Sequence, residues 1–412
     1  MREASPLILE AHARVRDLYG SAIGRSKYEV VTPALIVDRD VVEANLSHME
    51  SRLPELHARL RGHVKNHKSP HIARMQLEHG AFGLCAATIW EAIVMVHAGA
   101  DDVLIANQLV TPQKREAAAL LARQANVIVN VDDVGDAEAL SEAATSAGTT
   151  VGVLVEVDTG MHRCGVDSRE EALAVARRVS ELPGLRMDGL SGYEGHCSLE
   201  MDRDARHAKQ AAAMEYFVSV ADFLEANGIP CRILSAAGTA TAFWTGADPR
   251  ITELQLGSYA AMDDYHYLME PSFRKATTAV VTVISRRKDR VVLNLGKKTF
   301  GAADVGNIPA YPRIVGYEHL VPYRFDEEHA TYEADDSCAL KVGDVVGFHL
   351  GYTPFAVNYF DAYHVVEGEQ VVDIWPIMPR GPLHGGLLDL LRDETAAGSG
   401  AGAAVVAGGT SR

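Results

Sequence analysis

The chain has 412 residues, of which 47% are hydrophobic and 23% are charged, and its formal net charge is -16. A chain of this length holds about two domains, and the composition is that of a soluble globular protein. The strong negative charge argues against nucleic acid and anionic membranes as partners.

No apolar run approaches the roughly 20 residues that cross a bilayer. Residues 1–17 carry acidic side chains and lack the apolar centre of a secretory signal. The cysteines are scattered and form no CxxC pair, so neither a disulfide framework nor a thiolate zinc site is indicated; they are Cys85, Cys164, Cys197, Cys231 and Cys338. We therefore expect a cytoplasmic protein.

The N-terminal part mixes helix and strand patterns. Residues 7–20 have the spacing of an amphipathic helix that Gly20 closes. Residues 28–31 and 34–38 are predicted to be short strands. Residues 40–60 carry apolar side chains at helical spacing, which predicts a second helix.

From residue 63 onward, strand and helix patterns alternate. The predicted strands are residues 63–67, 83–88, 102–107, 126–131, 151–158, 187–195, 232–238 and 252–258. The predicted helices between them include residues 90–98, 114–124, 137–146, 170–180 and 206–227. This alternation predicts an α/β protein with a parallel (β/α)8 barrel of the TIM type. An open doubly wound sheet is the alternative, but no GxGxxG follows an early strand.

After residue 270 the sequence becomes rich in β-branched and aromatic residues, which predicts a separate β domain. Its predicted strands are residues 277–285, 290–295, 345–349 and 363–366. We therefore expect a barrel over residues 33–269 and a β domain over 270–385 that includes the N-terminal segment 1–32. Residues 386–412 are expected to be a disordered tail, because their end is rich in Gly, Ala and Ser.

Two small-residue loops follow the last two predicted barrel strands. In such barrels the working residues lie at the C-terminal ends of the strands, and a phosphate site often follows strands seven and eight. Residues 235–241 and 256–259 offer backbone N–H groups and Ser or Thr hydroxyls at that position. Either loop alone is explained by glycines that turn the chain, but the two together favour a phosphorylated ligand.

A lysine at another strand end completes the pattern. A lysine amine and a phosphate site in one barrel mouth suggest pyridoxal 5'-phosphate (PLP), which a lysine binds as a Schiff base. Lys65 and Lys68 are three residues apart, so an extended strand would place them on opposite faces. Lys65 lies inside the predicted strand, whereas Lys68 lies at its Ser-Pro end, and Lys65 is therefore the predicted Schiff-base lysine.

Seven stretches resemble the fold-type III PLP enzymes, in the D-threonine aldolase and D-serine dehydratase branch of the alanine racemase-like family. They are TPALIVD at residues 32–38, HVKNHKSPHIARMQ at 63–76, EVDTGMHRCGV at 156–166, GYEGH at 192–196, SAAGT at 235–239, TELQLGSY at 252–259 and VVDIWPI at 371–377. The resemblance covers most of the chain, and it implies the barrel, the β domain and PLP.

The resemblance also implies roles for single residues. Lys65 resembles the Schiff-base lysine, Arg163 the arginine beside the phenolic oxygen of the cofactor, and Tyr193 the tyrosine at its pyridine nitrogen. His196 resembles a histidine near the reacting face, and the alternative is a hydrogen-bonded structural histidine. The residues implied around the cofactor and its phosphate are Ser235, Gly238, Thr239, Gly257, Ser258 and Tyr259.

One departure from the family pattern concerns a metal. The branch usually carries a histidine in the β domain, followed two residues later by aspartate or cysteine. A register without gaps up to Asn358 places Tyr352 and Pro354 at these positions. Proline has no side-chain donor atom and a neutral phenol is a poor ligand for a divalent ion. A divalent metal is therefore doubtful, and the alternative is a rebuilt metal site.

The resemblance implies a lyase, an aldolase that cleaves β-hydroxy-D-amino acids to glycine and an aldehyde, with His196 or Tyr352 as the base. The alternatives are a PLP-dependent dehydratase or racemase of D-amino acids and a non-enzymatic PLP-homeostasis protein, against which the β domain argues. The expected partners are a small amino-acid substrate and, by the same resemblance, a second copy in a homodimer.

Overall fold

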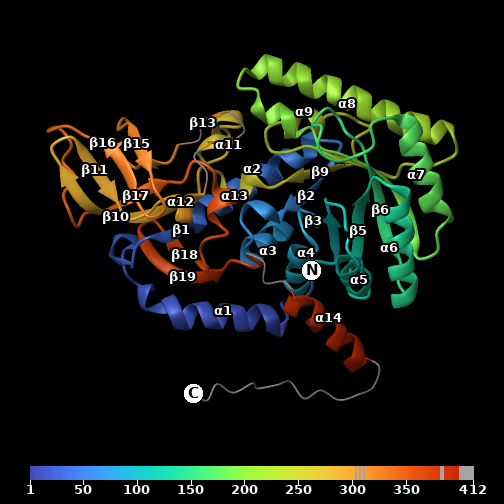
Figure 1. Cartoon of the computed structure of the whole chain (residues 1–412), viewed down its shortest axis with the longest axis horizontal. Helices are drawn as coiled ribbons and strands as arrows, with labels where there is room; N and C mark the ends of the chain where they lie inside the picture. Colours follow the sequence, from blue (N-terminus) through green and yellow to red (C-terminus); the bar gives the residue numbers. More distant parts are fainter. Residues whose placement is uncertain (302–303, 306–307, 310, 381–384, 399–412) are drawn as a thin grey trace.

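The computed structural model describes residues 1–301, 304–305, 308–309, 311–380 and 385–398. Two bodies lie side by side: a barrel ringed by helices and a domain built mostly of strands (Figure 1). Among the described residues, no helix combines the length and the apolar stretch that crossing a bilayer would need.

The barrel consists of parallel strands that close in chain order, which confirms the predicted (β/α)8 architecture and rejects the open doubly wound sheet. Its strands are β2 (Arg59–His63), β3 (Gly83–Ala86), β4 (Asp102–Ile105), β5 (Asn126–Val131), β6 (Val151–Glu156), β7 (Leu185–Gly192), β8 (Ile233–Ala236) and β9 (Glu253–Leu256). Side chains such as Val127, Val129 and Val153 are buried, as expected for parallel strands covered on both faces.

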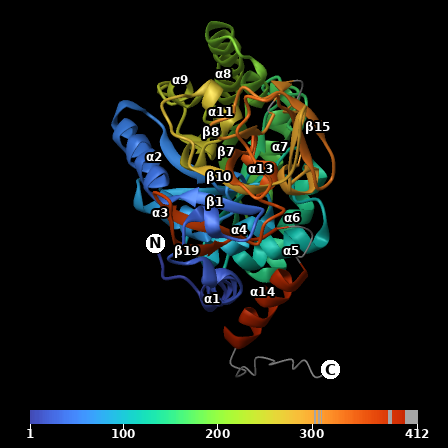
Figure 2. The same ribbon diagram turned by 90° about the vertical axis from the view of Figure 1, so that its left-hand side faces the viewer.

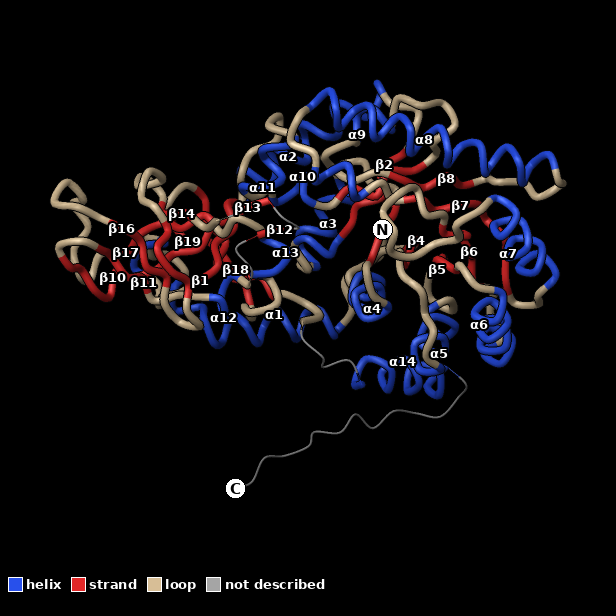
Figure 3. The backbone as a smooth tube through the Cα atoms, turned by 45° about the horizontal axis from the view of Figure 1, so that its top comes forward, coloured by secondary structure: helices blue, strands red, loops and turns tan. Residues whose placement is uncertain are grey.

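Helices surround the barrel strands (Figure 3). They are α3 (Pro70–Glu78), α4 (Ile89–His97), α5 (Pro112–Leu121), α6 (Val134–Ala147), α7 (Arg169–Glu181), α8 (Arg203–Ala226) and α9 (Ala242–Thr245). Side chains of Ser69, Thr88, Asp133, Ser168 and Asp202 accept hydrogen bonds from the first turns of their helices. Such N-caps fix where each helix begins after its strand.

The second domain is a nine-stranded sheet. Its strands are β1 (Ala34–Asp38), β10 (Thr277–Arg287), β11 (Arg290–Leu293), β14 (Arg313–Ile314), β15 (Pro322–Phe325), β16 (Ala330–Glu333), β17 (Val345–His349), β18 (Ala362–Glu367) and β19 (Gln370–Pro376). The strands β12 (Asp304–Val305) and β13 (Ile308–Pro309) pair separately. Helix α1 (Pro6–Tyr19) lies next to β19 (Figure 2), and α2 (Arg39–Arg52) leads into the barrel.

Short helices connect the two bodies at the barrel mouth. They are α10 (Ser258–Ala261), α11 (Asp264–Met269), α12 (Lys297–Phe300) and α13 (Thr353–Ala356). Tyr265 N–H donates to Gly351 O (3.0 Å), so α11, which follows the barrel, is tied to the segment that precedes α13. The sheet domain therefore reaches the end of the barrel where the site was expected.

Two predictions for the N-terminal part are wrong. Strand β1 belongs to the sheet domain, because Ala34 pairs with Val280 and Ile36 pairs with His364, so the barrel does not begin at residue 33. A short, fully apolar strand has the same pattern in either domain, and only its partners distinguish them. Residues 28–31 do not form a strand, because Ser26 caps a 3-10 turn over Lys27–Glu29.

Part of the predicted disordered tail is helical. Residues 385–398 form α14, and its Leu388 and Leu391 are buried against the apolar core. Arg392 forms an ion pair with Glu116 of α5 (2.8 Å). The two leucines and this ion pair attach α14 to the barrel, although composition alone predicted disorder for this segment. Residues 399–412, the rest of the predicted tail, lie outside the described residues.

Candidate active site

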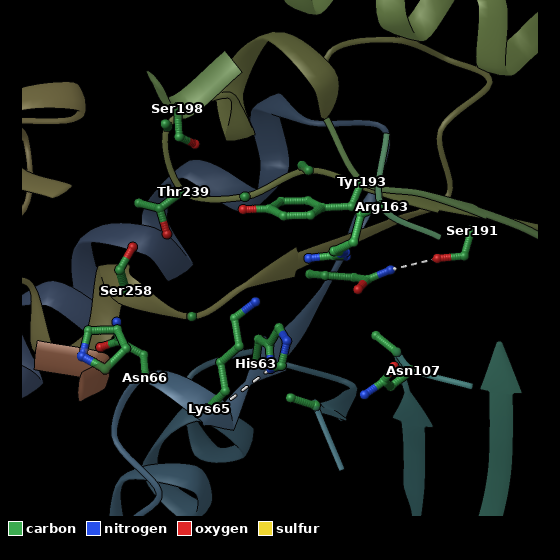
Figure 4. Close-up of a pocket in the computed structure, with 18 of the residues that line it drawn as sticks. His63, Lys65, Asn66, Asn107, Arg163, Ser191, Tyr193, Ser198, Thr239 and Ser258 are labelled. Carbon is green, nitrogen blue, oxygen red and sulfur yellow. Dashed lines mark hydrogen bonds between the residues drawn. The ribbon is translucent and has the colours of Figure 1, made fainter. Parts of the chain in front are cut away.

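A pocket of about 260 Å³ opens at the C-terminal ends of the barrel strands (Figure 4). Most of its lining comes from the barrel, and Tyr352 and Pro354 come from the sheet domain. The predicted residues that line it are Lys65, Arg163, Tyr193, Gly238, Thr239, Gly257, Ser258 and Tyr352. The structure therefore brings together, from both domains, most of the side chains that the motifs singled out.

Lys65 lies just beyond a strand, not inside one. Strand β2 ends at His63, and a 3-10 turn follows over Val64–Asn66. The strand predicted over residues 63–67 is thus displaced by four residues, and side-chain alternation cannot distinguish Lys65 from Lys68. The geometry does distinguish them: Lys65 lines the pocket, whereas Lys68 Nζ pairs with Glu91 Oε1 (2.8 Å).

The surroundings of Lys65 favour its neutral amine. Its side chain projects into the pocket and is accessible there. The protein packed around the pocket still desolvates the amine, and this lowers the pKa of Lys65. The Arg163 guanidinium lowers this pKa further, and Glu91 acts in the opposite direction. A lysine with a lowered pKa has a larger share of nucleophilic amine at neutral pH.

Tyr193 follows β7, and its ring lies near the side chains of Lys65 and Arg163. Its ring centroid is 5.4 Å from Lys65 Nζ and 5.7 Å from Arg163 Cζ. Gly238 lies close to the ring, because a Cβ there would be 3.2 Å from Tyr193 Cε2. Desolvation raises the pKa of Tyr193, with Glu194 adding to the effect, so the hydroxyl is a neutral phenol at physiological pH.

A buried carboxyl group in the pocket wall, that of Glu156, lies beside Arg163. Glu156 Oε2 accepts hydrogen bonds from Gln108 Nε2 (2.6 Å) and Asn130 Nδ2 (3.1 Å), and Glu156 Oε1 is 4.0 Å from Arg163 Nη2. Burial raises the pKa of Glu156. Sequence reasoning missed Gln108, Asn130 and Glu156. The signal in the sequence was their place near strand ends: Glu156 is the last residue of β6, Asn130 is the last but one of β5, and Gln108 follows β4.

The loops after β8 and β9 have the features of a cradle for an anion. Thr239 is buried, and its Oγ1 has no hydrogen-bond partner among the described residues, nor does Oδ1 of the buried Asn66. A Cβ on Gly257 would lie 2.8 Å from His63 O, so only glycine fits between this loop and the end of β2. A phosphate group would fit this site, because the Thr239 and Ser258 hydroxyls could bind it and the glycine backbone lets it approach closely.

Two predicted cofactor residues lie behind the pocket wall. Ser235 is fully buried, and its Oγ accepts a hydrogen bond from Gln255 Nε2 (3.0 Å). Tyr259 is also buried, and its hydroxyl accepts a hydrogen bond from Gln76 Nε2 (3.2 Å). Neither lines the pocket, so the expectation that they contact the cofactor is not supported. They belong to the packing of the barrel strands and helices.

His196 is not brought to the pocket either. It lies in the 3-10 segment Gly195–Leu199. Tyr193, which precedes this segment, and Ser198 within it line the main pocket instead. His196 lines a separate surface pocket together with Asp158 and Lys209. The tight turn after β7 rotates successive side chains to different sides, which a motif match does not reveal. The prediction that His196 serves as the base therefore lacks structural support.

Tyr352 lines the pocket beside a histidine that sequence reasoning missed. Its ring stacks on His266 with centroids 5.3 Å apart and an interplanar angle of 23°. His266 Nδ1 lies 2.8 Å from Oδ1 of the buried Asp263, and Asp263 Oδ2 accepts from Thr353 N–H (2.9 Å). Asp263 thus joins α11 to α13 and orients His266. An Asp-x-x-His pair shortly after β9 was the available signal.

The positions of the expected metal pair hold Tyr352 and Pro354, and both line the pocket. Over the described ranges, no three His, Cys, Asp or Glu side chains come close enough to hold a metal ion. A phenol whose pKa is raised by desolvation and a proline ring are not the donors that divalent ions select. The side chains at these positions therefore do not fit a divalent metal.

Comparison with known proteins follows the same division into two domains. Residues 37–264 match the family described as alanine racemase, N-terminal domain, and residues 276–366 match the putative serine dehydratase domain. The chain is 35% identical to D-threonine aldolase of Arthrobacter sp over 85% of this chain and 93% of that protein. It is 31% identical to 3-hydroxy-D-aspartate aldolase of Paracoccus denitrificans over 87% and 94%.

A solved structure shares the whole arrangement. The crystal structure of D-threonine aldolase from Filomicrobium marinum superposes with a TM-score of 0.81 and 34% identity, covering 88% of this chain and 99% of that one. Both domains are thus covered by one group of relatives. The chain belongs to the alanine racemase-like family of fold-type III PLP enzymes, in the branch of D-threonine aldolase and D-serine dehydratase.

Proposed function

We propose that the protein is a PLP-dependent aldolase that cleaves β-hydroxy-D-amino acids to glycine and an aldehyde. The two relatives named above are aldolases of such compounds, and the chain covers more than nine tenths of each. One observation in the structure carries the proposal: the Lys65 amine projects into the pocket that the Gly238–Thr239 and Gly257–Ser258 loops also line.

The residues present fit PLP. Lys65 would bind it covalently, and the hydroxyls of Thr239 and Ser258 would hold its phosphate. Arg163 and the neutral Tyr193 would contact its ring, by the family resemblance at the phenolic oxygen and the ring nitrogen. When bound, PLP supplies an electron sink for the electron pair left at Cα.

The acid–base work falls to a pair of residues in the same pocket. Cleavage requires that the β-hydroxyl gives up its proton while the Cα–Cβ bond breaks, and that Cα later takes up a proton to give glycine. Desolvation raises the pKa of Tyr352, which makes its phenolate scarce. Tyr352 alone is therefore a poor base, although its hydroxyl can pass on a proton.

His266 is the better proton acceptor. Because the Asp263 carboxylate can only accept, His266 Nδ1 carries the proton of the 2.8 Å hydrogen bond, which leaves the Nε2 lone pair as the basic site. His266 lines the pocket next to Tyr352. We assign the base to His266 acting with Tyr352, in place of the predicted His196.

We propose further that the reaction proceeds without a divalent metal. The reason is the chemistry of Tyr352 and Pro354, which offer no suitable donor for a divalent ion at the expected ligand positions. The alternative is a metal site rebuilt from other donors, which metal removal and replacement would reveal.

We also propose a cytoplasmic homodimer. The cysteines are free, which fits a reducing compartment, and the dimer follows from the family resemblance. A PLP-binding protein without activity is less well supported, because the sheet domain contributes Tyr352 and Pro354 to the pocket.

The decisive experiment is a substrate screen on the protein purified with PLP. D-threonine, D-3-hydroxyaspartate and their L-isomers are incubated separately, and glycine, aldehyde, 2-oxo acid and the inverted amino acid are measured. Glycine with aldehyde from the D-isomers supports the proposal. A 2-oxo acid as the main product would make the protein a dehydratase, and inversion at Cα would make it a racemase.

A further inference from the structure

The segment that carries Lys65 is anchored to the sheet domain through the next residues. Tyr363 Oη donates to His67 O (2.9 Å), Met378 N–H donates to Lys68 O (2.7 Å), and Lys68 Nζ donates to Pro379 O (3.3 Å). Lys68 has a φ of 49°, a conformation that non-glycine residues rarely adopt. Lys68 is therefore held in a defined place by contacts from another domain.

Lys68 also neutralises a carboxylate at the edge of the pocket. Lys68 Nζ lies 2.8 Å from Glu91 Oε1, and the two side chains are 14% and 2% exposed. Glu91 Oε2 accepts a hydrogen bond from the backbone N–H of Ala87 (2.7 Å), and Ala87 lines the pocket. Both oxygens of Glu91 are thus occupied.

Lys65 lies near the same carboxylate, because His63 of β2 pairs with Cys85 of β3, and Lys65 and Ala87 each follow two residues after this pair and line the same pocket. The groups that act on its amine are Cys85, Arg163 and Glu91, and Arg163 opposes a charge on it. Burial raises the pKa of Cys85 to about 12, so its thiol is neutral. Glu91 is therefore the anion that would favour a charged Lys65.

The side chains next to Lys65 on its own element and across the pocket are His63 and Tyr193. Burial lowers the pKa of His63 far below its usual value, and desolvation raises that of Tyr193, so both are neutral near pH 7. Neither side chain can take the place of Lys68 as a partner for Glu91.

We propose that Lys68 is a positioning residue that keeps the Glu91 carboxylate paired, so that the Lys65 amine stays unpaired and nucleophilic. The proposal rests on the role of Lys65 in the proposed function. Removing one partner of a buried ion pair leaves the other charge without compensation. Without Lys68, the uncompensated Glu91 carboxylate would favour the protonated form of the nearby Lys65 amine.

The test measures the nucleophilicity of Lys65 directly in the cofactor-free protein. Trace labelling with acetic anhydride over a pH series, read by mass spectrometry of the peptide that holds Lys65, gives the labelling rate of that amine. Four proteins are compared: the unaltered chain, Lys68→Met, Lys68→Met with Glu91→Gln, and Lys298→Met. The last removes an exposed ion pair with Glu328 in the sheet domain and serves as the control.

In Lys68→Met we expect Lys65 to label about tenfold more slowly at about pH 8, because a rise of one unit in pKa lowers the free amine about tenfold. Adding Glu91→Gln should restore the rate, and Lys298→Met should leave it unchanged. Thermal unfolding of each protein shows whether it is folded at the labelling temperature.

Equal slowing in Lys68→Met and in the double variant would overturn the proposal, because Lys68 would then only anchor the backbone. An unchanged rate in Lys68→Met would overturn it as well. Failure of the proposed function looks different: PLP would then give no visible absorption band with the unaltered protein, whereas the labelling rates of Lys65 would still report on Glu91.

Discussion

Gly257 offers a direct test of the proposed phosphate site, because a single added methyl group there would clash with the neighbouring backbone. In Gly257→Ala the added Cβ would lie 2.8 Å from the carbonyl oxygen of His63 and 3.3 Å from its Cβ. Gly257 has φ -119° and ψ -54°, which alanine can adopt without strain in φ. The perturbation is therefore steric, and it pushes the loop after β9 away from the end of β2.

The size of the effect follows from the overlap. A Cβ to oxygen distance of 2.8 Å must open by several tenths of an ångström. Both contacts are with His63, which lies two residues before Lys65, and Gly257 directly precedes Ser258, so the shift moves pocket residues on both sides. Overpacking of this kind costs about 1–3 kcal/mol. If that cost falls on the form that binds PLP, the affinity for PLP drops about 5-fold to 150-fold, since each 1.4 kcal/mol is tenfold.

The affinity is measured by titrating PLP into the cofactor-free protein and following visible absorbance. Gly20→Ala is the control, because the Cβ there would meet nothing closer than 4.0 Å and the residue lies at the end of α1. An affinity for PLP within twofold of the unaltered protein in Gly257→Ala would show that this loop does not shape the cofactor site.

Further predictions use other parts of the molecule. Borohydride reduction of the PLP-bound protein should fix the cofactor to Lys65, and Lys65→Ala should abolish turnover; label on Lys68 instead would contradict the assignment. Tyr352→Phe should lower the rate by about 10²–10⁴, and activity should survive prolonged chelation without gain from manganese, magnesium or zinc. A silent Tyr352→Phe would leave His266 as the base, and loss of activity on chelation that one divalent ion restores would reveal a metal site. The partly buried Asp373 is paired with His12, and its pKa is lowered to about 2. Because the pKa of Asp373 is lower in the folded than in the unfolded chain, its charge stabilises the fold at neutral pH, and this gain is lost as pH falls through the folded pKa. Asp373→Asn should therefore cost about 2 kcal/mol at neutral pH and only about 0.4 kcal/mol near pH 2. Urea unfolding at both pH values measures the difference, and an equal loss at both would rule out this linkage.

The barrel could be predicted because its strands and helices alternate in the sequence, but the first barrel strand could not be placed correctly. It contains Arg59 and Arg61, which do not look like strand residues of a barrel core. Arg61 is fully buried because Glu253 holds it through two hydrogen bonds (2.9 and 3.0 Å) and Asp102 through another. Its partners lie on other strands, so no local pattern could reveal that the charge is neutralised. The strand was therefore assigned to the more β-like residues 63–67.

The candidate site was predictable where one residue's type carries the chemistry, as for Lys65 and the small-residue loops. It was not predictable where the chemistry depends on a partner distant in the sequence. His266 is a candidate base because Asp263 orients its ring by a hydrogen bond and Tyr352 stacks on it, and Tyr352 belongs to the other domain. Conversely, His196 lies in a family motif and was predicted to be in the active site, but the turn after β7 directs its side chain to another pocket.

The two domains divide the chemistry in a way that bears on how the reaction type is set. Lys65, Tyr193 and the two loops all lie at barrel strand ends, so under the proposed function the barrel would bind the cofactor. Tyr352 and Pro354 lie within the segment of the sheet domain that matches the serine dehydratase domain. Substitutions in that segment should therefore change which bond is broken while they leave the affinity for PLP intact, and substitutions at the barrel strand ends should lower that affinity first. Measuring PLP affinity and the product ratio on the same variants would show whether the two functions separate along the domain boundary.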